Sequence, residues 1–167
     1  MKIILLPVTL LAILFCFVTP SIVNAQQKLL EVREEKVNPE DGLGFIAKRL
    51  GEKIKLIIYS PVSKKKEGLY KNIAEKRLAE LKHVVDKSDM ANFEKATTRY
   101  STTIGDWSEY INKKNLTTQK QQAIDILNEQ TPVIKTLMDK FDSNTAEWRF
   151  LKQDLDYANI YISQLGK

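Results

Sequence analysis

The sequence has few of the residues from which covalent scaffolds and metal centres are built, with one cysteine and one histidine in 167 residues. A single cysteine excludes a disulfide scaffold and any metal site made of several thiolates of one chain. A single histidine excludes a histidine-rich metal centre within the chain. Six glycines and five prolines are too few for a collagen-like or Pro/Gly-rich low-complexity protein. The length instead suits one globular domain with short appendages.

Long hydrophobic runs are confined to the N-terminus. Lys2 supplies a positive charge, residues 3–18 are almost wholly apolar, and Val-Asn-Ala at 23–25 fits the small-residue pattern of a cleavage site before Gln26. The apolar run is shorter than the ~20 residues of a membrane-spanning helix. We therefore predict a cleaved signal peptide over residues 1–25 and an extracytoplasmic protein that is secreted, periplasmic or associated with the cell envelope. An uncleaved signal anchor is the alternative.

The cysteine does not indicate a lipoprotein. Cys16 lies deep in the apolar run, and Phe15 before it is too bulky for the usual lipidation motif. Cleavage before Gln26 would leave a chain without cysteine and would lower the formal net charge from +5 to +4, because Lys2 is lost.

After a polar tether at residues 26–42, apolar residues recur at the three- and four-residue spacings of α-helices. The pattern predicts an all-α fold, an antiparallel bundle of four long helices preceded by a shorter amphipathic helix, forming one domain over residues 43–167. This domain divides into a module at 43–112 and a C-terminal helical pair at 117–166. The expected helices cover about residues 43–59, 61–87, 90–111, 118–141 and 145–166.

The first helix has apolar residues on two sides. Phe45, Leu56 and Tyr59 lie on one side. The opposite side carries a stripe of seven apolar residues at 100° per residue: Leu43, Ile46, Ala47, Leu50, Ile54, Ile57 and Ile58.

The third helix has the most regular apolar pattern, with alternating steps of three and four that place seven residues in one seam. The seam consists of Met90, Phe93, Thr97, Tyr100, Ile104, Trp107 and Ile111. Pro132 lies inside the fourth helix and should kink or divide it, because proline removes a backbone hydrogen bond. The expected N-caps of the last four helices are Ser60 before Pro61, Ser88 or Asp89, Thr117 or Thr118, and Asn144 with Glu147 three residues later.

Two segments resemble the signatures of a bacterial helical family. GFIAKRLGEKIKL at 44–56 is similar to its Pro-Leu-Tyr-x-x-Lys-Arg-x-x-Glu-x-x-Lys opening, although Leu-Gly-Phe at 43–45 stands where Pro-Leu-Tyr is usual. LYKNIAEKRLAE at 69–80 is similar to its Leu-x-x-x-x-Ala-Glu-x-Arg-Leu-x-Glu segment. The family is catalogued as domain of unknown function 5667. The resemblance covers residues 43–87, and reaches 112 if the third helix belongs to the module; it implies an exported or membrane-anchored helical protein and no activity.

No pattern in the sequence indicates an enzyme or a cofactor. Glu80 and His83 have the Glu-x-x-His spacing of di-iron sites in helical bundles, but such sites need two of these motifs and the chain has no second histidine. Ser/His/Asp chemistry would also depend on His83, which lies in a charged helix with no Gly-rich turn. We therefore predict no catalytic, cofactor-binding or metal-binding residue, a surface position for His83, and acidic residues at caps and helix surfaces. We interpret the aromatic set as core: Tyr100, Trp107, Phe141, Trp148 and Phe150.

Positive charge is concentrated in one segment. Residues 43–87 hold 12 basic and 5 acidic residues, whereas residues 26–42 and 88–167 are each slightly negative. This basic helical hairpin is predicted to contact an anionic membrane surface or an acidic envelope polymer, and a merely solvated lysine-rich face is the other interpretation. A secretory signal makes nucleic acid an unsuitable partner. The candidate contact residues are Lys48, Arg49, Lys53, Lys55, Lys64, Lys65, Lys66 and Lys71.

The leading hypothesis is therefore an exported, non-enzymatic helical bundle that binds or scaffolds at the cell envelope through its basic hairpin. An extracytoplasmic stress or chaperone-like module is a second hypothesis. A sensor ectodomain is the third, if the first segment remains as an anchor. Each hypothesis leaves room for a protein partner, and the sequence does not determine the oligomeric state.

Overall fold

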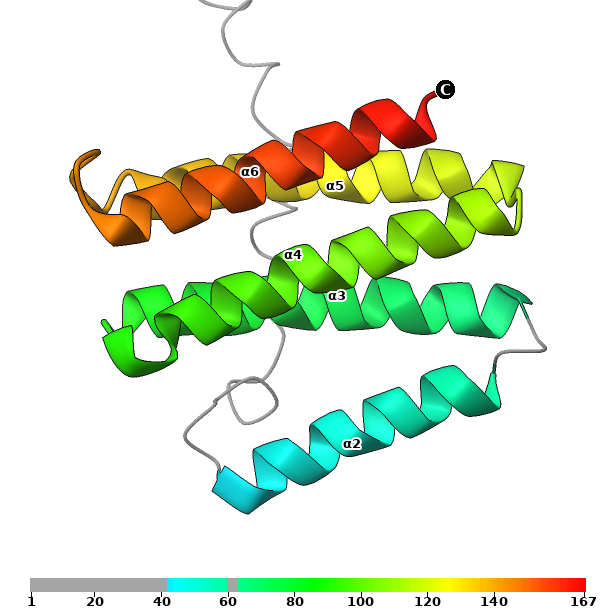
Figure 1. Cartoon of the computed structure of the whole chain (residues 1–167), viewed down its shortest axis with the longest axis horizontal. Helices are drawn as coiled ribbons and strands as arrows, with labels where there is room; N and C mark the ends of the chain where they lie inside the picture. The colour runs from blue at the N-terminus through cyan, green and yellow to red at the C-terminus, as the bar shows by residue number, and fades with distance from the viewer. Residues whose placement is uncertain (1–41, 60–62) are drawn as a thin grey trace, which may run out of the picture.

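The computed structural model describes residues 42–59 and 63–167, and all regular structure within these ranges is helical (Figure 1). This confirms the predicted all-α fold. The predicted signal peptide, the tether up to residue 41 and the Ser60-Pro61 junction lie outside the described residues. The helices are α2 (Gly42–Ile58), α3 (Ser63–Asp86), α4 (Met90–Lys113), α5 (Thr117–Met138) and α6 (Ala146–Leu165).

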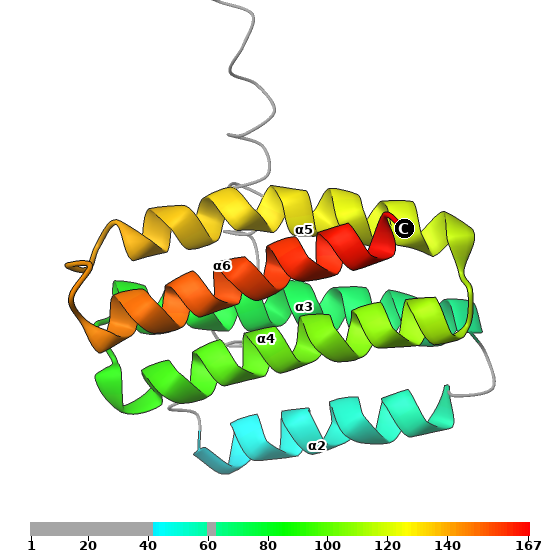
Figure 2. The same cartoon turned by 45° about the horizontal axis from the view of Figure 1, so that its top comes forward.

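The four long helices form an antiparallel bundle, and α2 lies on its outside (Figures 1 and 2). Helix α3 packs chiefly on α4 and α5 chiefly on α6, while contacts between α4 and α6 join the two pairs. Short turns between successive helices impose this antiparallel order. Helix α2 runs beside the α3–α4 pair (Figure 2).

The regular seam of α4 is the centre of the core. Six of its seven predicted positions are buried, and only Met90, in the first turn, is 43% exposed. Burial of each large apolar side chain contributes about 1.5–3 kcal/mol to folding. The bundle therefore has a well-packed core against which α2 packs from outside. Fully buried apolar partners come from each of the other bundle helices, among them Leu81, Leu127 and Leu151.

The N-cap of α4 is one of the two expected residues, whereas the cap of α5 differs from the expectation. The Asp89 side chain accepts a hydrogen bond from the backbone N–H of Asn92 at 3.3 Å. Neither Thr117 nor Thr118 caps α5, because the helix begins at Thr117 and its N-cap is Leu116, which makes no side-chain cap hydrogen bond. Capping preferences favour a hydroxyl residue such as Thr117 at the N-cap. The tight turn after α4 instead makes Thr117 the first residue of the helix and Leu116 its N-cap.

The N-cap of α6 is Thr145, so the prediction of Asn144 was wrong by one residue. The Thr145 Oγ1 accepts a hydrogen bond from the Trp148 N–H at 3.2 Å and donates one to the Asp142 carbonyl oxygen at 2.7 Å. The Asn144 N–H instead donates to the Asp142 side chain at 2.9 Å. Asn144 therefore belongs to the turn before the helix.

Replacement of Thr145 by alanine should lower the free energy of unfolding by about 1 kcal/mol, because the first turn of α6 loses its side-chain acceptor. Urea denaturation of Thr145→Ala measures this loss. Asn144→Ala is the matched control, since Asn144 is exposed and does not cap the helix. Equal losses in the two variants would contradict the assignment of the cap.

Pro132 does not divide α5, which runs unbroken from Thr117 to Met138, so the expectation of a division was wrong. Proline cannot donate to the carbonyl oxygen four residues earlier, which belongs to Asn128. The Thr131 hydroxyl donates to that oxygen instead, at 3.1 Å. The helix continues because a neighbouring side chain satisfies the acceptor that proline leaves free.

Helix α2 packs against the bundle with one side only. Phe45 is 6% exposed, and Leu56 and Tyr59 on the same side are half-buried. The opposite apolar stripe faces solvent, with Leu43 84% and Ile57 73% exposed. Within the described residues, no helix is long and apolar enough to cross a membrane.

Candidate functional site: a basic cavity beneath helix α2

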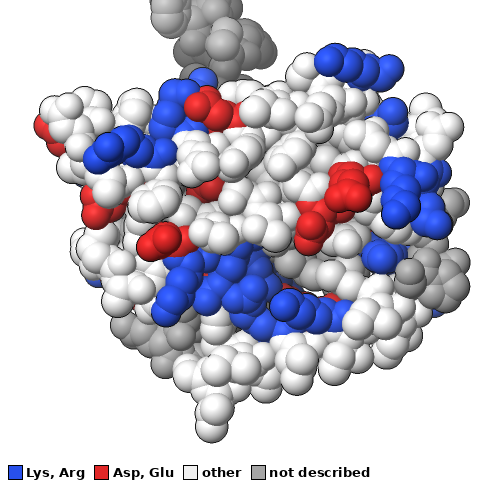
Figure 3. All heavy atoms as spheres, viewed as in Figure 1, with Lys and Arg blue, Asp and Glu red and all other residues white. Residues whose placement is uncertain are grey.

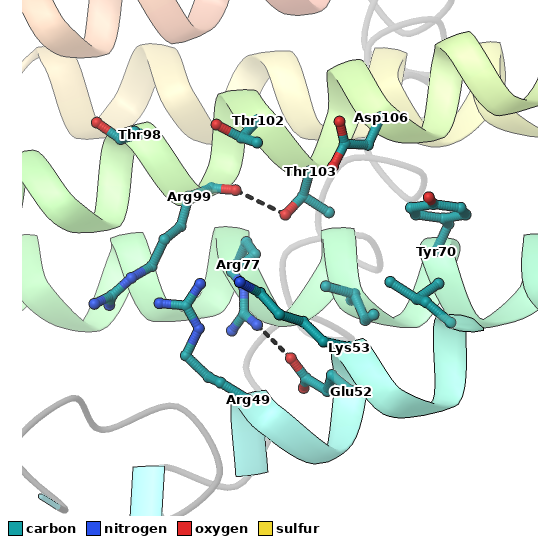
Figure 4. A pocket seen from close by; sticks show the side chains of 12 residues that line it. Arg49, Glu52, Lys53, Tyr70, Arg77, Thr98, Arg99, Thr102, Thr103 and Asp106 are labelled. Atoms are coloured by element: carbon teal, nitrogen blue, oxygen red, sulfur yellow. Dashed lines mark hydrogen bonds and ion pairs between the residues drawn. The ribbon is translucent and has the colours of Figure 1, made fainter. Parts of the chain in front are cut away.

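A cavity of about 340 Å³ lies between α2, α3 and α4. In the space-filling view it is the hollow in which basic side chains gather, between α2 and α4 (Figure 3). Its volume is within the range of small-molecule sites. The lining has a basic end, a hydroxyl-bearing wall on α4 and an apolar end (Figure 4).

Two carboxylates hold the basic end together. Glu52 of α2 accepts hydrogen bonds from Arg77 and, at 3.3 Å, from Lys76. Glu80 of α3, which is fully buried, accepts from Arg77 at 3.2 Å and from Arg99 of α4. This chain of ion pairs joins the three helices. Because Arg77 and Arg99 share these carboxylates, their charges are largely neutralised.

Arg49 and Lys53 add two more cations to the same end, and no ion pair involves either of them in the part of the chain that the structure describes. Arg49 is half-buried, with its guanidinium carbon 5.8 Å from the centre of the Phe45 ring, while Arg99 lies 5.1 Å from that ring. Burial lowers the pKa of Arg49, and the charges of Arg77 and Arg99 lower it further. In Figure 4 these cationic side chains converge on one region.

The α4 wall presents hydroxyl groups to the cavity. Thr98 and Thr102, one turn apart, line it and are exposed. The hydroxyl of Thr103 is already engaged, because it donates to the Arg99 carbonyl oxygen at 2.7 Å (Figure 4). Thr98 and Thr102 therefore form the exposed rim of the cavity on α4.

The other end of the cavity is apolar on α2 and α3. Leu56, Ile73 and Tyr70 line it, and the Tyr70 ring lies 5.6 Å from that of Tyr110. Asp106 lies on α4 at the same end (Figure 4), and burial raises its pKa. The cavity thus has a cationic end and a largely apolar end that also carries Asp106.

The structure separates the predicted basic contacts of α2. Arg49 and Lys53 line the cavity. Lys48 and Lys55 lie on another side of the helix, where they border a shallower hollow together with Lys76. These four basic residues of α2, although close in sequence, therefore lie on two different surfaces.

The predicted contacts of α3 lie outside the cavity beneath α2. Lys66 is half-buried, with its Nζ 4.9 Å from the centre of the Tyr110 ring and 5.9 Å from that of Tyr70. Such a cation–π contact stabilises the packing of the lysine against the rings. Of the others, Lys65 is exposed, Lys71 is half-buried, and the side chain of Lys64 lies outside the described part.

Sequence reasoning missed Arg77 and Arg99, the two arginines at the centre of the cavity. Arg77 is largely buried, whereas a residue of a Lys-rich helix was expected to be solvated. Arg99 belongs to the nearly neutral segment 88–167, so a sum of charges over the segment concealed it. The position of Arg99, one residue before Tyr100 of the core seam, was the signal in the sequence that could have indicated a place near the core.

The Glu-x-x-His motif has a structural explanation. Glu80 is buried and ion-paired, which corrects the expectation that acidic residues occupy only caps and surfaces; Glu67 and Asp154 are buried too. His83 is half-exposed. Among the described residues, no group of three His, Cys, Asp or Glu side chains is arranged to hold a metal ion.

The aromatic set belongs to the core, as predicted. Tyr100 and Trp107 are fully buried, and the Tyr100 hydroxyl donates to Gln130 at 2.9 Å. Phe141, Trp148 and Phe150 pack against the same cluster.

Comparison with known families identifies the module that carries the cavity. A family model described as a domain of unknown function, DUF5667, matches residues 36–135. The chain belongs to this family. The DUF5667 match includes both signature segments and extends past residue 112 into α5, so every residue lining the cavity falls inside it. No curated protein and no solved structure matches the chain.

Proposed function

We propose that this DUF5667 protein is exported, has no catalytic role, and binds the anionic surface of a membrane of the cell envelope through α2. The observation that carries the proposal is the solvent-facing apolar stripe of this helix. Six of its large side chains are between 47% and 84% exposed. They are Leu43, Ile46, Leu50, Ile54, Ile57 and Ile58.

The shape of the stripe favours a helix that lies in the membrane surface. At 100° per residue the stripe covers an arc of about 120°, and α2 is about 25 Å long. Lys53 borders the arc on one side, and Lys48 and Lys55 lie beyond the other. An apolar face flanked by lysines is typical of helices that insert shallowly between lipid head groups.

Charge complementarity favours anionic lipid over a neutral partner. The hairpin of α2 and α3 belongs to the segment with 12 basic and 5 acidic residues. Each lysine or arginine near an anionic leaflet contributes about 1 kcal/mol of attraction, which salt screens. An acidic polymer would use these charges but would leave the apolar stripe uncovered.

Export is a separate part of the proposal. It is supported by the signal-like residues 1–25. Expression of the complete gene, followed by mass spectrometry of the purified protein, tests it. A chain that begins at Gln26 is expected. Retention of residues 1–25 would overturn cleavage and favour the anchored sensor.

Vesicle co-sedimentation of the processed protein tests membrane binding. We expect binding to phosphatidylglycerol vesicles, little binding to phosphatidylcholine vesicles, and weaker binding at high salt. The double variant Leu50→Gln/Ile54→Gln should bind at least about tenfold more weakly, because two apolar side chains no longer leave water. Both residues are exposed, so the fold should be retained.

Ile160→Gln is the matched control, since Ile160 is an exposed apolar residue of α6. It should bind vesicles as the unchanged protein does. If the double variant also binds unchanged while high salt abolishes binding, the contact is purely electrostatic, as with an acidic polymer, and insertion of α2 is wrong. If the stripe instead suppresses aggregation of an unfolded client without preference for anionic lipid, the chaperone-like alternative replaces the proposal.

A further inference from the structure

We propose that the cavity beneath α2 binds a phosphomonoester group that carries an apolar body. This inference goes beyond membrane binding, because the cavity and the exposed stripe lie on different sides of α2. The cavity residues Arg49, Glu52 and Leu56 share one side of the helix, and the stripe residues Leu50 and Ile54 share another.

The charge balance of the cavity favours a doubly negative group. Glu52 and Glu80 are already engaged by Arg77 and Arg99. Arg49 and Lys53 remain at the basic end as two cations without an ion pair in the described part of the chain, while the carboxyl group of Asp106 lies at the other end of the cavity (Figure 4). A phosphomonoester carries a charge of about −1.5 to −2 at pH 7, which matches these two cations.

Arg49 can present its guanidinium to an anion, because it lines the cavity and forms no ion pair with another described residue. It is half-buried beside two other arginines, and the repulsion and burial lower its pKa. A planar guanidinium can donate two parallel hydrogen bonds to phosphate oxygens. A bound phosphate would offset both the burial and the repulsion of like charges.

The other walls suit the remainder of such a ligand. Thr98 and Thr102 give the α4 side of the cavity a polar, exposed rim. At the far end, Leu56, Ile73 and the ring of Tyr70 offer apolar surface (Figure 4). The volume of about 340 Å³ holds a phosphate together with a short apolar chain or ring.

Hexyl phosphate is the probe, because it combines the phosphomonoester with an apolar body in a soluble molecule. Calorimetric titration should detect binding of hexyl phosphate to the processed protein, at least about tenfold tighter than that of inorganic phosphate or of hexanoate. Equal binding of hexanoate would overturn the assignment of a phosphomonoester. Equal binding of inorganic phosphate would overturn the role of the apolar end.

Arg49→Gln should weaken binding of hexyl phosphate at least about tenfold. Arg49 has no ion pair to lose among the described residues, and the change relieves repulsion, so the variant should fold, which circular dichroism checks. Lys53→Gln is a second variant with the same expected direction. Lys55→Gln is the matched control, because it removes one charge from α2 outside this cavity. Equal effects of Arg49→Gln and Lys55→Gln would overturn a defined site.

Two sources can supply this chemistry, a soluble metabolite or a lipid with a terminal phosphate, and vesicles distinguish them. For a lipid, Arg49→Gln should weaken binding to phosphatidate vesicles but not to phosphatidylglycerol vesicles. For a soluble ligand, both vesicle affinities should stay unchanged while the affinity for hexyl phosphate falls.

The two proposals fail separately. Leu50→Gln/Ile54→Gln should leave hexyl phosphate binding unchanged, since neither side chain lines the cavity. If the protein binds hexyl phosphate but not vesicles, the phosphomonoester site stands and membrane binding is wrong. If it binds vesicles but not hexyl phosphate, membrane binding stands and the phosphomonoester site is wrong.

Discussion

Replacement of Glu80 by alanine is expected to lower the free energy of unfolding by about 3–5 kcal/mol. The carboxylate is fully buried between two arginines whose side chains are only 7% and 17% exposed. Its removal leaves Arg99 without an ion-pair partner in the described structure and Arg77 with Glu52 alone. An uncompensated buried charge is strongly destabilising. Urea denaturation at neutral pH measures the loss.

Asp86→Ala is the matched control for Glu80→Ala. Asp86 also pairs with two cations, Lys82 and Lys140, but all three side chains are at least 31% exposed. Exposed pairs of this kind contribute about 0–1 kcal/mol. A similar loss in both variants would show that Glu80 is not a buried link between α3 and α4.

Replacement of Asp154 by asparagine is expected to stabilise the protein, increasingly so as the pH rises from about 4 to 8. Asp154 of α6 is 2% exposed, and its Oδ2 has no hydrogen-bond partner. Burial raises its pKa from 3.8 to about 8, against a smaller lowering by the nearby hydroxyl of Ser101. The folded protein therefore holds this carboxyl group in its neutral form.

The direction of the pH dependence follows from proton uptake. Between pH 3.8 and 8 the folded state binds the proton of Asp154 and the unfolded state releases it, so stability falls as the pH rises. The two pKa values correspond to a destabilisation of at most roughly 6 kcal/mol above pH 8. Asparagine keeps the shape and has no charge, so its advantage should level off above that pH.

Denaturation of Asp154→Asn at pH 5 and at pH 9 tests this, and the gain should be larger at pH 9. Asp156→Asn is the control, because Asp156 is exposed on the same helix and pairs with Lys152. Its effect should be small at both pH values. A loss of stability in Asp154→Asn at pH 9 would mean that the buried carboxylate is stabilised by a contact that burial alone does not describe.

The periodicity of apolar residues was enough to predict the bundle, because a helix that is packed along its length has apolar residues at spacings of three and four. The seam of α4 from Phe93 to Ile111 is the clearest case, and the cap at Asp89 followed from local hydrogen bonding. Of the two outcomes expected at Pro132, a kink or a division, the division does not occur; the hydrogen bond from Thr131 to the free carbonyl oxygen depends on a side-chain rotamer, which the sequence does not specify.

The packing of α2 could not be predicted in the same way. The stripe of seven apolar residues is the larger side in sequence, yet Phe45 of the smaller side is buried and Leu50 of the stripe is 58% exposed. The side that packs is the one that also brings Glu52 to Arg77, and this match involves a residue 25 positions away. Periodicity within one helix contains no information about such a partner.

The low content of cysteine and histidine, the helical periodicity, the basic segment and the family signatures are properties of the sequence alone, because each depends on composition or on residues close together in the chain. Tertiary structure decided which acids are buried, which face of α2 meets water, and that Arg49, Arg77 and Arg99 share one cavity. Those features depend on three helices meeting in space. Burial and the interaction of charges distant in sequence arise only when these helices pack together, and both determine where the cavity beneath α2 forms.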